Sequence, residues 1–213
     1  MTNGKFPSVG SAETHEGMCV AENREVNITG QLIQGIFITF VEVQDHVPPH
    51  FFRTIMALKK IINPWYNYPG YNCFGCSPDN PIGLHLSFYE DGDYIVSTWH
   101  PSKNYQGWID TMHGGILSTL IDEVCGWVVT RKMQASGYTV QLNVKFRKAV
   151  PTNEPELTIR AKVEKQVRNL VYLHAEITNS KGELCNEGEV VYFLMNEEKS
   201  KEMGFLQCKV EGE

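Results

Sequence analysis

The sequence lacks an apolar run long enough to cross a lipid bilayer, which takes about 20 consecutive apolar residues. The apolar stretch at residues 32–43 is interrupted by Gln34, Gly35, Thr39 and Glu42. The first residues also lack the basic region followed by an apolar region that is typical of a secretory signal. We therefore expect a cytoplasmic protein that has no membrane partner.

Positive charge is also scarce in this sequence. The 19 Lys and Arg residues are outnumbered by 25 Asp and Glu residues, which gives a net charge of −6. Such a balance provides no overall attraction to nucleic acid or to an anionic membrane, so we expect no nucleic-acid partner. A polyanionic ligand would need a local patch of basic side chains.

The six cysteines do not form a pattern that is typical of a metal site. Cys73 and Cys76 make one CxxC, but a structural zinc site needs four ligands and no second Cys or His pair has a usual spacing. His85 and His100 are the candidate partners, and both fall in predicted strands. A redox CxxC normally opens a helix in a βαβ unit, which this sequence lacks. We predict free thiols that pack or line a pocket, with no metal and no cofactor.

Changes of composition divide the chain into four segments. We predict an N-terminal extension at 1–55 that is poorly ordered or partly helical, a helix and an irregular segment at 56–83, the main domain at 84–196, and a C-terminal tail at 197–213. Within the first two segments, a strand is possible at 32–43 and a short helix at 50–62. One interpretation of the first break is that translation begins naturally at Met56. The other is that the extension binds a partner or serves as a lid.

The pattern after residue 83 predicts two strands, one long helix and then four strands. The strands are expected at 84–88, 94–99, 139–148, 156–165, 170–178 and 183–195, and the helix at 115–131. A parallel sheet would need a helix between successive strands, and only one helix is predicted. We therefore expect an α+β fold in which an antiparallel sheet packs on one central helix.

The predicted helix has two different faces. Its apolar stripe consists of Ile116, Leu117, Leu120, Ile121, Val124 and Val128. Asp122 lies almost opposite the centre of this stripe, with the small residues Ser118, Thr119 and Gly126 nearby. A solvated helix face would normally carry Lys, Glu and Gln instead. Because small residues let a ligand or another backbone come close, we expect Asp122 to face an interface or a pocket.

His113, Gly114 and Gly115 precede this helix. Two glycines permit a close approach to the backbone, and the first amides of a helix are unpaired donors at the positive end of its dipole. They could therefore polarise a carbonyl oxygen, as in an oxyanion hole. A simple helix-start turn is the alternative, and both interpretations can hold together. His113 either orients the carbonyl or holds the turn.

Three segments together resemble the HGG-type, PaaI-like family of hotdog-fold acyl-CoA thioesterases. In this family a His-Gly-Gly turn opens the central helix, and a catalytic Asp or Glu follows nine residues after the histidine, as Asp122 follows His113. Residues 72–84 resemble the segment before the domain, with Ser77 in place of its glycine, and residues 139–149 resemble the strand after the helix. The resemblance covers about residues 65–195. It implies a hotdog fold, with an antiparallel sheet wrapped around one long central helix, and hydrolysis of an acyl-CoA thioester.

The resemblance also implies roles for individual residues. Asp122 is expected to be the general base that activates water, or else a nucleophile, with Glu123 as the fallback. Gly115, with Gly114, is expected to donate a backbone N–H to the thioester carbonyl. Thr139 is expected to help hold the water, although a threonine is also common in a strand for structural reasons. The family forms dimers edge to edge, so we expect a homodimer, or a homotetramer built as a dimer of dimers, with its active sites at the dimer interface.

Further candidates for substrate binding follow Thr139. We predict that Gln141 and Asn143 share its face and line the site. Lys145 and Arg147, with Arg168 in a later turn, could meet the phosphates of coenzyme A, or could belong to an ordinary solvated strand edge. Two other functions stay open, a non-catalytic acyl-CoA-binding hotdog protein and, third, a hydroxyacyl dehydratase.

Overall fold

The computed structural model describes residues 26–33, 36–43 and 58–213, in two compact units that divide between Thr54 and Ile55. The first unit contains β1 (Val26–Ile33) and β2 (Ile36–Val43), which pair as an antiparallel hairpin. The predicted single strand at 32–43 is therefore wrong in its bounds, and 26–33 is a strand rather than poorly ordered or helical chain. β-Branched residues on both sides of the connection favour this pairing.

The second unit is built on a seven-stranded sheet in the order β3-β4-β5-β7-β8-β9-β6, and all neighbouring strands are antiparallel. The strands are β3 (Lys59–Lys60), β4 (Tyr89–Asp91), β5 (Tyr94–Trp99), β6 (Gly137–Phe146), β7 (Leu157–Val167), β8 (Leu170–Asn179) and β9 (Leu184–Leu194). This arrangement confirms the predicted antiparallel sheet. It also leaves β6 at one edge, paired with β9 alone among the described strands.

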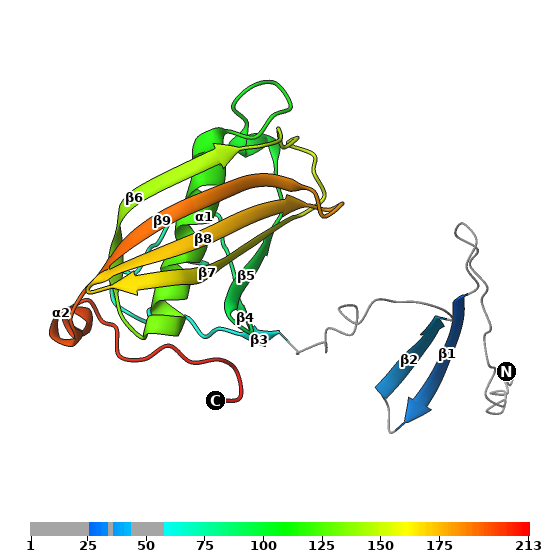
Figure 1. Cartoon of the computed structure of the whole chain (residues 1–213), viewed down its shortest axis with the longest axis horizontal. Helices are drawn as coiled ribbons and strands as arrows, with labels where there is room; N and C mark the ends of the chain where they lie inside the picture. Colours follow the sequence, from blue (N-terminus) through cyan, green and yellow to red (C-terminus); the bar gives the residue numbers. More distant parts are fainter. Residues whose placement is uncertain (1–25, 34–35, 44–57) are drawn as a thin grey trace, which may run out of the picture. The chain divides into compact units, whose positions relative to one another are not determined.

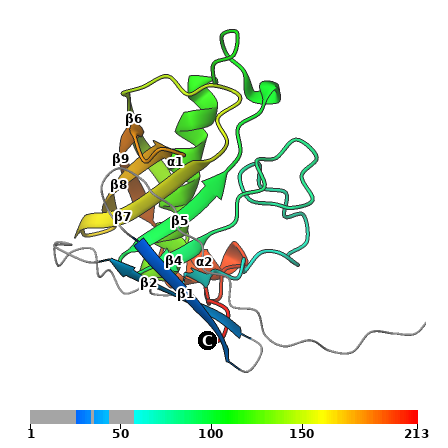
Figure 2. The same cartoon turned by 90° about the vertical axis from the view of Figure 1, so that its right-hand side faces the viewer.

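The helix α1 (Gly114–Val128) lies along the inner side of this curved sheet, where it packs against β5 to β9 (Figure 1, Figure 2). Its apolar stripe is fully buried at Leu120, Ile121, Val124 and Val128. A π-helical turn, Val129–Met133, continues it and ends before Gln134, whose φ of 49° is left-handed. The predicted central helix is thus confirmed, with its start one residue earlier. Among the described residues, no helix has both the length and the apolar character to cross a membrane.

Residues 84–88 are not the strand that the sequence predicts. Leu84, Leu86 and Phe88 do alternate as buried residues. However, the Leu84 and Leu86 amides donate to the carbonyl oxygens of Phe74 and Gly75, at 2.8 and 2.9 Å, instead of to a strand of the sheet. The regular ladder begins only at β4. An alternating pattern therefore identified an extended, half-buried segment correctly but assigned it the wrong hydrogen-bond partner.

The predicted helix at 50–62 is also wrong where it can be compared, because residues 59–60 form β3 and Ile61 makes a bridge with Val210. Residues 50–57 lie outside the described residues.

The bridge between Ile61 and Val210 also shows that the C-terminal segment packs against the domain. After α2 (Glu197–Glu202) the chain returns to the domain, and Phe205, Cys208 and Val210 are buried in its core. The segment predicted as a tail is therefore a structural part of the domain.

On the outer face of the sheet, His174 lies between two acidic side chains. His174 on β8 has its Nδ1 3.0 Å from Glu189 and its Nε2 3.3 Å from Glu176. Arg160 donates two hydrogen bonds to Glu176, at 2.9 and 2.7 Å. Partial burial lowers the pKa of His174, but the hydrogen bonds to Glu189 and Glu176 outweigh it, so this pKa lies above its ordinary value of 6.5.

We therefore expect His174 to stabilise the folded protein at low pH. A histidine with a raised folded-state pKa contributes fully below its unfolded value, about 6.5, and the contribution is lost as pH rises through the folded value. The wild type should exceed His174→Gln in free energy of unfolding by more at pH 6 than at pH 8, measured by urea denaturation. Glu189→Gln should reduce this pH dependence, and an equal difference at both pH values would contradict the assignment.

Candidate functional site

Three elements meet around the Asp122 carboxylate. Asp122 lies on α1, Thr139 on β6 and Tyr192 on β9. The Thr139 hydroxyl donates to Asp122 Oδ1 at 2.6 Å, and the Tyr192 hydroxyl lies 3.2 Å from the same oxygen and 3.0 Å from the Asp122 backbone oxygen. Asp122 Oδ2 receives no hydrogen bond from the residues that the structure describes. One carboxylate oxygen is thus held from two strands, and the other is available to a ligand.

The small-residue face of α1 admits one of these partners. A Cβ atom on Gly126, one turn after Asp122, would lie 3.0 Å from the Tyr192 hydroxyl. Glycine at this position therefore gives Tyr192 room to reach the helix. The sequence predicted a close neighbour for this face but did not identify Tyr192. Tyr192 pairs with Thr139 across β6 and β9, and this pairing follows from the strand register, so the sequence alone could not identify Tyr192.

Tyr192 is a hydrogen-bond donor rather than an anion at this site. Its side chain is buried, and burial, followed by the negative charge of Asp122, raises the pKa of Tyr192 above its ordinary value. A neutral phenol close to a carboxylate oxygen donates a hydrogen bond to it. Tyr192 therefore helps to hold the Asp122 side chain in position.

The start of α1 is a tightly bonded turn. His113 is its N-cap, and its Nδ1 accepts the Gly115 N–H at 2.9 Å. The His113 carbonyl accepts the amides of Ile116 and Leu117, and its own amide donates to Tyr105. The Gly114 N–H has no acceptor among the described residues. His113 therefore holds the turn, and Gly114 carries the amide that is free to bind a ligand.

The structure does not bring this turn and Asp122 together within one chain. Gly114 and Asp122 are eight residues apart on α1, which corresponds to about 12 Å along the helix axis. A base and an oxyanion donor must both lie within a few ångströms of the reacting carbonyl. The two predicted halves of the site therefore cannot act on one substrate from a single subunit.

The prediction that Gln141 and Asn143 share the face of Thr139 is wrong. The register between β6 and β9 shifts between Thr139 and Gln141, so Val140 has no partner of its own. After this bulge Val144 pairs with Gly188 on the helix side. Gln141 and Asn143 consequently point to the outer face. A bulge inserts one residue and reverses the alternation that follows it.

Two of the three predicted basic residues share one acidic partner, and the third lies elsewhere. Lys145 and Arg147 lie on the outer side of β6, where both contact Glu187. Arg168 is exposed in the turn between β7 and β8, with a φ of 55°. The structure therefore places these three side chains away from Asp122 of the same chain.

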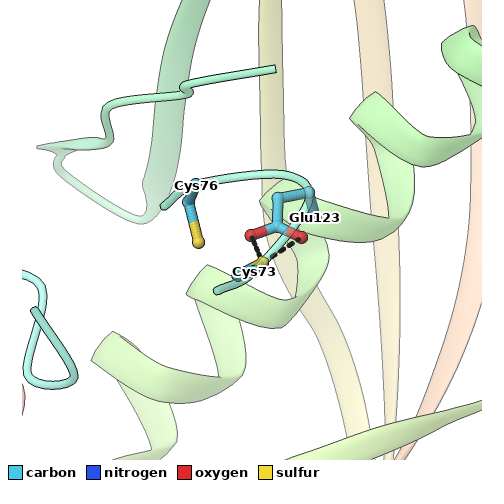
Figure 3. A group of neighbouring side chains, drawn as sticks. All are labelled: Cys73, Cys76 and Glu123. Atoms are coloured by element: carbon cyan, nitrogen blue, oxygen red, sulfur yellow. Dashed lines mark hydrogen bonds between the residues drawn. The ribbon is translucent and has the colours of Figure 1, made fainter. Parts of the chain in front are cut away.

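A second cluster adjoins the Asp122 site (Figure 3). Cys73 Sγ lies 3.5 and 3.7 Å from the two oxygens of Glu123, and Cys76 Sγ is close by. The predicted alternatives are elsewhere, since His85 contacts the Asn80 carbonyl oxygen and His100 the Pro155 carbonyl oxygen. Glu123, which the sequence suggested only as the fallback for the catalytic base, is thus the acid that meets the CxxC.

Residues 110–186 match the family model described as "Thioesterase superfamily". A protein of Sulfurisphaera tokodaii named "Putative esterase" is 28% identical over 86 residues, which cover 40% of this chain and 63% of that protein. The chain therefore matches a little less than two thirds of the length of this curated relative.

Solved structures show the same architecture. A thioesterase superfamily protein aligns with a TM-score of 0.52 at 21% identity, over 57% of this chain and 59% of its own. AziG of S. sahachiroi aligns with a TM-score of 0.50 at 19% identity, over 53% and 93%. A hypothetical thioesterase protein of Streptococcus pneumoniae TIGR4, solved with coenzyme A, has a TM-score of 0.49 at 25% identity, over 52% and 86%. Residues 110–186, which contain α1 and β6 to β8, are therefore similar to the thioesterase superfamily, and the domain has the hotdog fold.

Proposed function

We propose that this protein hydrolyses an acyl-CoA thioester to a free acid and coenzyme A. The match to the thioesterase superfamily supports thioester hydrolysis in general. The observation that carries the residue assignment is the Asp122 carboxylate, with Oδ1 held by Thr139 and Tyr192. Its Oδ2 has no donor among the described residues, as a general base needs if it is to accept a proton from water.

The proposed reaction begins when Asp122 takes a proton from a water molecule. The water oxygen attacks the thioester carbonyl carbon, the C–S bond of the tetrahedral intermediate breaks, and the proton passes from Asp122 to the departing sulfur. The Thr139 hydroxyl donates a hydrogen bond to Asp122, so the lone pairs of its oxygen can accept a hydrogen bond from the water. Attack by Asp122 itself, through a mixed anhydride, is the second candidate mechanism.

The carbonyl oxygen needs a donor that a single subunit does not supply, and we propose that a second copy of the chain supplies it. β6 is an edge strand in which Tyr138, Val140, Leu142 and Phe146 are exposed. An apolar edge of this kind favours pairing with another strand. Two copies of one strand related by a two-fold axis pair antiparallel. A homodimer through β6 is therefore the proposed unit, and a homotetramer would be two such dimers.

Antiparallel pairing would bring the two halves of the site together. Within one chain, the Phe146 ring at the end of β6 lies beside Gly114, where an added Cβ atom would be 3.3 Å from it, while Thr139 near the start of β6 contacts Asp122. Reversing the second β6 would place the partner's helix start beside this chain's carboxylate. The free Gly114 amide of the partner would then polarise the carbonyl, joined by the Gly115 amide if that amide leaves His113.

We propose that basic residues outside the Asp122 site bind the phosphates of coenzyme A. Lys145 and Arg147 are exposed cations at the edge that the dimer would share, and Arg168 is an exposed cation in the turn between β7 and β8. The outer-face positions of Gln141 and Asn143 count against a role for them in the same chain.

A cytoplasmic location is proposed because all five described cysteines are free thiols.

Asp122→Asn should abolish turnover while keeping the hydrogen bonds to Oδ1. A carboxamide cannot accept a proton from water, so we expect a loss of at least ~10²-fold in kcat. The measurement is thiol release from a panel of acyl-CoA esters. Asp93→Asn, in the exposed turn between β4 and β5, is the matched control and should keep full activity. A wild type that binds an ester but cleaves none would identify a binding protein instead.

Tyr192→Phe should lower kcat by roughly 10-fold with little change in KM, because it removes one hydrogen bond of about 1.5–3 kcal/mol from a charged group. Tyr172→Phe, on the outer face of β8, is the control. Thr139→Val should have a larger effect, since it also removes the contact proposed for the water. If Tyr192→Phe and Thr139→Val both had wild-type kcat, the catalytic assignment of this site would be refuted.

A shared site predicts that two inactive variants rescue each other. Asp122→Asn should be inactive as a homodimer because it lacks the base, and Gly114→Val because its side chain would crowd Phe146 and shift the amide away from the substrate. In a heterodimer, one site combines an intact Asp122 with an intact Gly114, so equal mixing by co-expression should restore about a quarter of the wild-type activity. Sedimentation analysis should give a dimer for both variants. Failure of rescue in verified heterodimers would place the complete site in one chain.

A further inference from the structure

The CxxC segment, defined as residues 65–83, brings two thiols to the second acid of α1. Cys73 Sγ, Cys76 Sγ and a carboxylate oxygen of Glu123 all lie within 4.8 Å of one another. Cys73 and Glu123 are 50 residues apart in the sequence. Figure 3 shows the two sulfur atoms and the carboxylate pointing toward a common centre beside the helix. This cluster does not include Asp122 itself, although Tyr192, which contacts Asp122, lines the same cavity.

The spacing within the cluster suits a tetrahedral metal ion. Zinc binds thiolate sulfur at about 2.3 Å and carboxylate oxygen at about 2.0 Å. At the tetrahedral angle these two bond lengths separate sulfur from oxygen by about 3.5 Å. The Cys73 sulfur lies 3.5 Å from Glu123 Oε1. An ion could therefore enter between the ligands with little movement of the chain.

Neighbouring side chains already orient the ligands. The Trp127 indole N–H donates to Glu123 Oε1 at 3.2 Å. Asn63 donates to the Tyr71 hydroxyl at 2.7 Å, which leaves the hydroxyl proton free to point at Cys76 Sγ, 3.0 Å away. Metal ligands are typically fixed by such outer hydrogen bonds, which also support their negative charge.

The backbone of the segment is adapted to this approach. Gly75 lies between the two cysteines, and a Cβ atom there would overlap the carboxyl group of Glu123. The amide of Ser77 donates to the Cys73 carbonyl, which closes the loop around the two thiols. A glycine is thus required for the CxxC to reach the helix.

A fourth position is open. Cys73, Cys76 and Glu123 line a cavity of about 220 Å³. The same cavity is lined by Trp65, Tyr71 and Gly126. A zinc ion with three protein ligands normally completes its coordination with water or a small ligand, and this cavity has room for one.

We propose that Cys73, Cys76 and Glu123 form a zinc site with one open coordination position. Each thiol releases its proton to solvent as its sulfur binds the ion. The two thiolates favour zinc over hard cations such as magnesium or calcium, which prefer oxygen ligands. Bound zinc fixes the CxxC segment to α1 at the residue next to Asp122. We predicted no metal from the sequence because Glu123 is 50 residues from Cys73, so its approach to the two cysteines gives no local pattern.

Cobalt(II) is the probe for this site. Titration of the reduced full-length chain should produce thiolate-to-cobalt charge-transfer absorption that saturates at one equivalent and disappears on addition of zinc. Cys73→Ser and Cys76→Ser should remove this absorption and weaken zinc binding by more than ~10-fold, and Trp127→Phe should weaken it by about 10-fold as an outer-shell change. Cys185→Ser, a buried thiol outside the cluster, is the matched control and should bind as the wild type does.

Wild-type protein with titratable thiols that gives no charge-transfer absorption would overturn the proposal, whatever the variants do. Zinc affinity that is unchanged in Cys73→Ser and Cys76→Ser would overturn it as well. Circular dichroism shows whether each variant is folded, and Glu123→Gln tests the third ligand with both thiols present. Asp122→Asn should bind zinc normally, so this result is independent of thioester hydrolysis.

Discussion

The packing of α1 against the sheet is the constraint on which the rest of the structure depends. Ile121 is fully buried, and a Cβ atom on Gly188 would lie 2.6 Å from its Cγ2. Glycine in β9 therefore lets the helix approach the sheet closely. Residues at every second position of a strand share one face, so Tyr192 points to the same side as Gly188. The contact that buries Ile121 thus also brings Tyr192 to Asp122.

Adjacent residues on α1 face different neighbours because each residue adds about 100° of rotation. Asp122 turns toward β6 and β9, where two hydroxyls hold it. Glu123 turns toward the CxxC segment, where it accepts a hydrogen bond from Trp127. Both acids stand beside a glycine that makes room for their partners, Gly126 in the helix and Gly75 in the loop. Two adjacent residues of the helix therefore lie in two different chemical environments.

Local periodicity was sufficient to predict the helix, five of the strands and the position of Asp122. The same periodicity failed at Gln141 and Asn143, because the bulge at Val140 reverses a face without leaving a Gly or Pro as a signal. Tyr192 and Glu123 could not be assigned from the sequence either. Their roles depend on strand register and on a contact across 50 residues, and neither is encoded in local spacing.

The described segments before and after residues 110–186, the part that matches the family model, pack into the domain. Trp65 contacts the rings of Trp127 and Phe205, so the CxxC segment, α1 and the C-terminal segment share one aromatic cluster. Arg131, just after α1, donates to Glu90 and to the Cys208 carbonyl. Isolated apolar residues such as Phe205 in a polar stretch give no periodic signal, which explains why the sequence suggested a tail. Because these contacts converge on the end of α1, removing either segment would expose the cavity beside Glu123 and loosen the helix that carries Asp122.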